Sequence, residues 1–215
     1  TLFRSYIAGG TASSDFPGNK TGVHQPTFQG GVCDGFVSIL NNDGNTLIAS
    51  SYFGTSGIEN IYGIQFDRNG FPYIMGTTTG NWPIQNATFR QTNGKQFIAK
   101  LEPNLSGFVY STVFGTNSPA PNLSPIAFLV DRCENVYVSG WGGSVNTTSG
   151  YLNSGTSGLS VTIDAIKSVS DNSDFYFFVL EKNAQKQLYG SFFGQNGGSG
   201  GEHVDGEIGR ASCRE

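Results

Sequence analysis

One pattern recurs three times along the chain at a constant internal spacing. Each copy starts with an aromatic-rich segment, passes through a polar turn, and ends with an aromatic residue followed by glycine. The copies are residues 36–54, 97–115 and 176–194, and in each the final glycine lies 18 positions after the first aromatic residue. A constant interval allows no insertion between two segments, as a β-hairpin requires. Such a repeat constrains the fold before any single residue does.

A second repeated segment follows the first two copies. Residues 63–76 and 127–140 each carry an aspartate, a polar turn and a Tyr-x-x-Gly strand, with the glycine nine positions after the aspartate. Residues 6–9 match the end of this segment, so the chain is predicted to open on the last strand of an earlier unit. Each full unit is therefore predicted to hold four short β-strands joined by Asn, Asp and Gly turn residues.

Apolar residues fall on both faces of the predicted strands. Neighbouring pairs such as Phe36 and Val37 point to opposite sides, because side chains alternate along a strand. Sheets that are buried on both faces can stack around an axis, as in a β-propeller. We therefore predict an all-β fold of β-propeller-type repeats, with four-stranded antiparallel blades in an incomplete arc. A two-sheet sandwich is the alternative, and it predicts stricter alternation and no constant repeat interval.

The repeat also suggests how the chain is divided. The predicted division comprises the last strand of a preceding blade with a linker (1–32), a first full blade (33–80), a linker (81–93), a second full blade (94–141), a Gly-, Ser- and Thr-rich loop (142–172) and the first half of a third blade (173–206). Residues 207–215 match a translated sequencing adapter and are interpreted as a non-native tail, so Cys213 supports no inference. Linkers of this length usually carry function or are disordered.

Composition excludes several classes of protein. The chain of 215 residues has 12 Lys and Arg against 16 Asp and Glu, so it presents no basic face for nucleic acid. No apolar run approaches the ~20 residues that a membrane-spanning helix needs. The 17 Phe and nine Tyr argue against a disordered chain, since disorder goes with few aromatic residues. We therefore expect a folded protein without a nucleic-acid partner or a membrane span.

Residues that could perform acid–base or metal chemistry are few and scattered. His24 lies in a linker and His203 in a Gly-rich stretch, and both are interpreted as solvated loop residues rather than ligands. His, Cys and carboxylate residues form no cluster at metal-ligand spacing, and neither a nucleophile elbow nor a pair of carboxylates stands out. The sequence therefore predicts no enzyme activity, no metal and no cofactor.

The acidic turns have structural interpretations. Residues 41–45 faintly resemble a calcium-binding loop, but Thr46 and Tyr52 stand where that loop needs glycine and a bidentate acid. We therefore expect a hairpin turn at this place. Asp67 and Asp131, at matching positions of the repeat, are predicted to cap turns rather than to do chemistry.

The cysteines and tryptophans leave alternatives open. Cys33 and Cys133 could form a disulfide with each other or with partners outside the chain, and sequence cannot decide between these. Trp82, Trp141 and Tyr151 could line a surface for carbohydrate or peptide. The favoured interpretation is that the tryptophans fill gaps between blades.

The repeated units resemble the SBBP family, which consists of β-propeller repeats of large bacterial surface and secreted proteins. Residues 36–76 and 97–140 carry the pattern: an aromatic strand ending in Leu, a Ser/Thr-x-Phe-Gly strand end, an aspartate turn and Tyr-x-x-Gly. The second unit departs from the first at Lys95, which stands in place of Asp34, and by extra residues at 117–125. The resemblance covers nearly all of the chain before residue 207.

This resemblance implies a segment of a long exported protein at the surface of bacteria that glide and use type IX secretion. It brings no catalytic residues. It suggests a non-catalytic structural or adhesive module whose partners are other blades or domains of the same protein, with surface glycans or proteins as further candidates. The alternatives are a carbohydrate- or peptide-binding propeller, and a propeller hydrolase or lyase whose site lies outside this segment.

Overall fold

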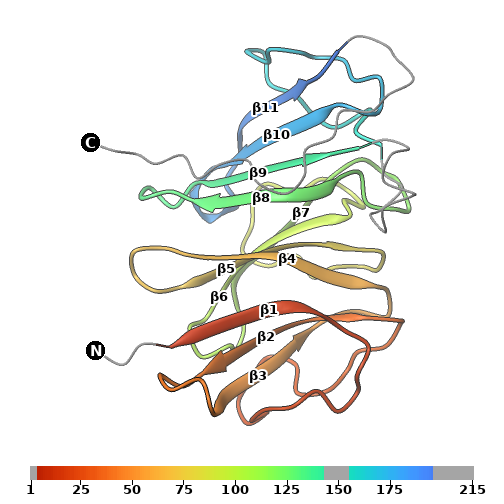
Figure 1. The fold of residues 1–215 in the computed structure, drawn as a ribbon. Helices are drawn as coiled ribbons and strands as arrows, with labels where there is room; N and C mark the ends of the chain where they lie inside the picture. Colours follow the sequence, from red (N-terminus) through yellow and green to blue (C-terminus); the bar gives the residue numbers. More distant parts are fainter. Residues whose placement is uncertain (1–3, 143–154, 196–215) are drawn as a thin grey trace.

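The chain forms three antiparallel β-sheets that follow one another in chain order (Figure 1). The computed structural model describes residues 4–142 and 155–195. Within this part, the helical content is a single 3₁₀ turn, η2, at Lys182–Ala184. The predicted all-β class is therefore confirmed.

The strands of each sheet are hydrogen-bonded in sequence order. The first sheet contains β1 (Ser5–Thr11), β2 (Asp34–Leu40) and β3 (Leu47–Phe53). The second contains β4 (Glu59–Phe66), β5 (Pro72–Thr78), β6 (Gln96–Leu101) and β7 (Phe108–Phe114). The third contains β8 (Ser124–Val130), β9 (Val136–Trp141), β10 (Phe175–Leu180) and β11 (Gln187–Phe193).

The strands group into sheets differently from the predicted division. Hairpin β2–β3 pairs with β1, whereas β4–β5 pairs across the linker with β6–β7. The predicted blades at 33–80 and 94–141 are therefore each divided between two sheets. The strand within residues 1–32 belongs to the same sheet as β2 and β3, and not to a preceding blade. Hairpin β10–β11 completes the third sheet instead of starting a new one. The predicted boundaries between sheets were wrong, because a sequence repeat gives the length of the repeating unit but not the residue at which one sheet ends and the next begins.

The first repeated hairpin has the same register in all three sheets. In each hairpin, the first aromatic residue of the first strand pairs with the residue that stands two positions before the closing glycine of the second strand. These pairs are Phe36–Tyr52, Phe97–Val113 and Tyr176–Phe192. Each hairpin shifts register before its closing leucine. Each turn also uses the left-handed region, at Gly44 (φ 69°) in the first, at Leu105 (φ 63°) in the second, and at Asn183 (φ 56°) and Ala184 (φ 50°) in the third. The predicted hairpins of constant length are confirmed.

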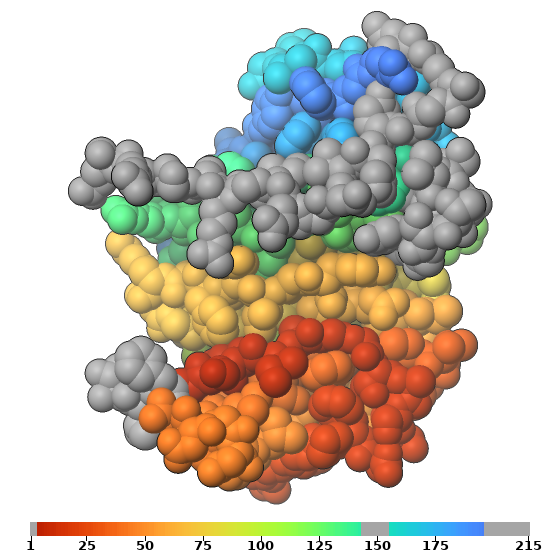
Figure 2. Space-filling view, viewed as in Figure 1, coloured from red at the N-terminus to blue at the C-terminus, as the bar shows by residue number. Residues whose placement is uncertain are grey.

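The second sheet is buried on both faces, as its apolar pairs predict. Ile74 and Phe97 belong to the core that it shares with the first sheet. Met75 and Ile98, their neighbours in the chain, belong to the core that it shares with the third. Figure 2 shows the layers in contact along this face of the molecule. Stacking thus hides apolar side chains that one sheet could not bury alone.

The long linkers are built into the sheets. The linkers before β2, β6 and β10 each run along the outer strand of their own sheet, with backbone hydrogen bonds such as Tyr52 N–H to Gln25 O (3.0 Å) and Phe192 N–H to Lys167 O (3.0 Å). The first two linkers also reach the following sheet, where His24 N–H donates to Leu105 O (2.8 Å) and Phe89 N–H to Ala184 O (2.8 Å). In the described residues these linkers therefore cover sheet edges and join neighbouring sheets.

Candidate functional site

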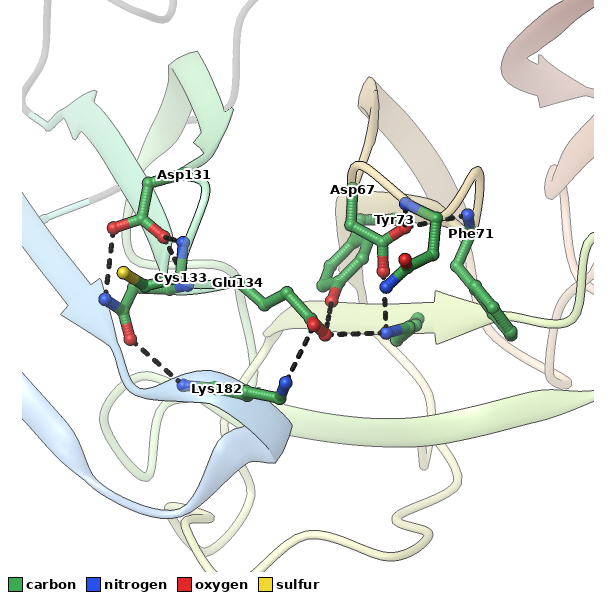
Figure 3. A network of polar contacts seen from close by, with 10 residues as sticks. Asp67, Phe71, Tyr73, Asp131, Cys133, Glu134 and Lys182 are labelled. Atoms are coloured by element: carbon green, nitrogen blue, oxygen red, sulfur yellow. Dashed lines mark hydrogen bonds and ion pairs between the residues drawn. The ribbon is translucent and has the colours of Figure 1, made fainter.

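A network of charged side chains, three of the four buried, joins the second and third sheets (Figure 3). Lys100 Nζ lies 2.8 Å from Asp67 Oδ2 and 2.8 Å from Glu134 Oε2. Lys182 Nζ lies 2.7 Å from Glu134 Oε1. Asp67 and Lys100 belong to the second sheet, whereas Glu134 and Lys182 belong to the third. The pair Lys100–Glu134 therefore crosses the junction between the sheets.

Two matching turns position the acids of this network. In the β4–β5 turn, the backbone N–H groups of Asn69 and Phe71 donate to Asp67 Oδ1 at 2.9 and 3.0 Å. In the β8–β9 turn, the N–H groups of Cys133 and Asn135 donate to Asp131 Oδ1, both at 2.8 Å. The prediction that these aspartates cap turns is confirmed. Sequence reasoning missed that the second oxygen of Asp67 also pairs with Lys100.

Glu134 holds a backbone conformation that favours glycine. Its φ is 67°, and the corresponding residue of the other turn is Gly70 with φ 82°. A side chain in this region costs about 1 kcal/mol relative to glycine. Glu134 is nevertheless only 5% exposed, and its carboxylate lies between Lys100 and Lys182. The left-handed turn thus directs a carboxylate across the sheet junction.

The ionisation of the network follows from its pairing. Burial alone would raise the pKa of Glu134, but hydrogen bonds and charges from Lys100 and Lys182 hold that pKa at about 2. Burial would likewise lower the pKa of Lys100, but Asp67 and Glu134 outweigh it and raise the pKa above its ordinary value. A general base works best with a pKa near the operating pH. Glu134 is therefore suited to hold two sheets together and poorly suited to accept a proton.

Aromatic rings surround the buried ammonium group. Lys100 Nζ lies 4.7 Å from the ring centroid of Phe71 and 5.1 Å from that of Tyr73, within cation–π range. The Tyr73 hydroxyl donates to Glu134 Oε2 at 3.2 Å. Burial, and then the charges of Glu134 and Asp67, raise the pKa of Tyr73. This hydroxyl therefore stays protonated and acts as a hydrogen-bond donor.

Acidification is expected to weaken this junction between about pH 4.5 and pH 2. The pKa of Glu134 is lowered on folding, from 4.5 to about 2. Its contribution to stability is therefore complete above pH 4.5 and is lost as the pH falls through the folded value. Free energies of unfolding measured across this range should show a steeper fall in the native protein than in Glu134→Gln. Equal slopes would contradict the assigned pairing.

The structure places His24 differently from the prediction. Its ring lies 4.6 Å from that of Phe108 and 5.7 Å from that of Phe53, so the side chain is half-buried between the first two sheets. Burial lowers the pKa of His24. The prediction of a solvated loop histidine is therefore wrong for His24, because its linker crosses from one sheet to the next. His203 lies outside the described residues.

The cysteines are not joined to each other. Cys33 is a half-buried free thiol beside the start of β4, and Cys133 is an exposed free thiol in the β8–β9 turn.

Residues 41–45 form the expected hairpin turn, in which Asn41 N–H donates to Thr46 O (3.0 Å) and Gly44 N–H to Asn41 O (3.1 Å). In the described part of the chain, no three His, Cys, Asp or Glu side chains are grouped to hold a metal ion.

Both tryptophans are buried. Trp82 stacks on Phe97 with ring centroids 3.6 Å apart, and its Nε1–H donates to Ser111 Oγ at 2.7 Å. Trp141 is also buried, and Tyr151 lies outside the described residues. The two tryptophans therefore fill the interior, as the favoured interpretation predicts, and do not offer an exposed surface for a ligand.

A shallow groove runs between β4 and β8. It has a volume of about 310 Å³ and is lined by two short segments, 62–65 and 125–128, together with Met75. No charged side chain lines it.

Among residues 4–142 and 155–195, no helix is long and apolar enough to cross a bilayer.

The chain was compared with known proteins. No protein-family model matches it, and no curated protein matches it.

Proposed function

We propose that this chain is a non-catalytic structural or adhesive module, made of β-propeller-type repeats, in an exported bacterial surface protein. One observation carries the proposal: the largest group of paired charges among the described residues joins the second sheet to the third. Lys100, Glu134 and Asp67 are all buried and paired with one another. A site that acts on a substrate would need such groups at an accessible surface.

The arrangement of the sheets supports a propeller. β4 contacts β8, so the first strands of the second and third sheets are neighbours. Sheets of a propeller are related in this way around a central axis. Burial of both faces of the second sheet favours the same reading over a two-layer sandwich, which buries one face of each sheet.

The first sheet has three strands, whereas the others have four. The place beside β1 that corresponds to β4 and β8 is unpaired among the described strands. We expect a strand of the same type, from another part of a longer chain, to fill it, since an unpaired edge invites strand addition. Export and surface location rest on the resemblance of the repeats to the SBBP family.

The proposal is tested by determining the structure of the longer natural protein. We expect roughly four to eight such sheets around one axis, as in known propellers. Two sheets packed face to face would overturn the propeller. A glycan array and hydrolase assays on the same protein address function: specific glycan binding or product release would replace the structural role.

A further inference from the structure

Two buried carboxylates without a cation lie at the junction of the first and second sheets. Asp34 begins β2 and Glu59 begins β4, and both are 0% exposed. The backbone brings them together, because Glu59 N–H donates to Cys33 O (2.8 Å) and Cys33 forms a parallel bridge with Ile58. Neither carboxylate forms an ion pair with a described residue.

The two carboxylates differ in their hydrogen bonds. Glu59 accepts bonds from Thr55 N–H (2.7 Å), the Thr55 hydroxyl (2.7 Å) and the Thr78 hydroxyl (2.5 Å). Asp34 accepts one bond at Oδ2, from Gln29 N–H (2.5 Å). Its Oδ1 is buried and has no partner among the described residues. A buried carboxylate oxygen in this state is costly unless something else neutralises it.

The third sheet shows what occupies this place elsewhere in the molecule. Asp174 corresponds to Asp34, since each precedes the first aromatic residue of its hairpin by two positions. Lys167 Nζ lies 2.6 Å from Asp174 Oδ1 and also donates to the carbonyls of Gly194 (3.4 Å) and Gln195 (2.7 Å). Gly194 corresponds to Gly54. An ammonium group thus sits between the carboxylate and the carbonyls at the end of the hairpin.

The first sheet lacks this ammonium group. Gln25 stands in the place of Lys167, because each accepts a backbone hydrogen bond from the same position of the outer strand. The Gln25 amide bonds to the backbone N–H and carbonyl of Gly54 and not to Asp34. The second sheet has Lys95 in the place of Asp34, and its ammonium group lies on the carbonyls of Thr79 and Gly80, which follow β5 and not the outer strand. The second sheet therefore has no carboxylate at this position to neutralise, and the third sheet neutralises its own with Lys167.

We propose that the first sheet binds a divalent cation of the calcium type at the place that corresponds to the Lys167 ammonium group. Asp34 Oδ1 and the Gly54 carbonyl would be ligands, and Glu59 would supply the second negative charge. Ca²⁺ prefers carboxylate and carbonyl oxygens, and two acids without a counter-ion match its charge. This site departs from the prediction of no metal, and it is independent of the number of sheets in the whole protein.

A proton is the competing occupant. Burial raises the pKa of Asp34, the hydrogen bond from Gln29 lowers it, and the charge of Glu59 raises it further. If a proton neutralised the site, the protein would gain stability as the pH fell toward the raised pKa, and calcium would have no effect.

The test is calcium binding by the full chain after treatment with a chelator. We expect calorimetry to find one Ca²⁺ per chain, and saturating Ca²⁺ to raise Tm by on the order of 5 °C. Asp34→Asn should abolish both effects. Asp164→Asn, which makes the same charge change at an exposed position of the linker before β10, should leave both intact.

Gln25→Lys tests the proposed calcium site while both carboxylates are kept. It should place an ammonium group on Asp34, raise Tm in the absence of Ca²⁺ and remove the response to Ca²⁺. The proposal is overturned if the native chain binds no Ca²⁺, if Asp34→Asn or Gln25→Lys responds to Ca²⁺ like the native chain, or if lowering the pH stabilises a calcium-insensitive protein.

Discussion

Replacing Lys100 with Met is expected to lower the free energy of unfolding by about 3–5 kcal/mol. The substitution keeps most of the side-chain volume but leaves Asp67 and Glu134 buried without their shared cation. Removal of one partner from a buried ion pair is destabilising because the remaining charge is neither paired nor hydrated. Urea unfolding, followed by circular dichroism, measures the loss.

Lys182→Met is the matched control. Its side chain is 49% exposed, and among the described residues its ammonium group pairs with Glu134, so its loss should change the free energy of unfolding by at most about 1 kcal/mol. Adding Glu134→Gln to Lys100→Met should recover part of the stability, since it removes one of the unpaired charges. Equal effects of the two lysine substitutions would contradict the assigned role of Lys100.

Replacing Trp82 with Ala is expected to destabilise the protein by about 3–5 kcal/mol. Trp82 is 6% exposed and packs on Phe97 in the core between the first two sheets, so its removal leaves a large cavity and deletes the hydrogen bond from its indole N–H to Ser111 Oγ. The measurement is again denaturant unfolding.

Ile84→Ala provides the comparison for Trp82. Ile84 is 43% exposed in the same linker, and its truncation should stay within about 0.5 kcal/mol of the native stability. A Trp82→Ala protein of native stability that lost a binding activity would show that Trp82 serves a ligand instead of the interior.

The hairpins could be predicted because the repeat reports them directly. The distance from the first aromatic residue to the closing glycine is the same in all three copies, which begin at Phe36, Phe97 and Tyr176. This constant distance predicts two strands joined by a short turn in each segment. The grouping of hairpins could not be predicted in this way. Gly76 pairs with Phe97 across a long linker, and nothing in the linear order says whether a hairpin bonds to the one before it or the one after it.

The turn-capping role of Asp67 and Asp131 was also predictable, since short acidic side chains bond to the backbone of their own turn. The charged network was not, because it forms between sheets. A signal did exist: Lys100 stands where the other copies have Ile39 and Val179, and Glu134 stands where the other turn has Gly70. Both departures from the repeat face the same junction. Comparing copies position by position could have identified the pair.

The same comparison explains the proposed cation site. Asp34, Lys95 and Asp174 occupy one position of the repeat, and their charges alternate in sign. Sequence alone does not reveal that Lys167 neutralises Asp174, because the linker that brings it there has no constant length. Only the folded linker shows that Gln25 takes the corresponding place beside Asp34.

The order of the strands is tested most directly by nuclear magnetic resonance on the isotope-labelled protein. Stacked sheets with β5 paired to β6 predict cross-strand backbone contacts between Met75 and Ile98 and between Gly76 and Phe97. If those contacts are missing, and β4–β5 instead shows backbone contacts to β2–β3, the three-sheet arrangement and the junctions inferred from it are contradicted.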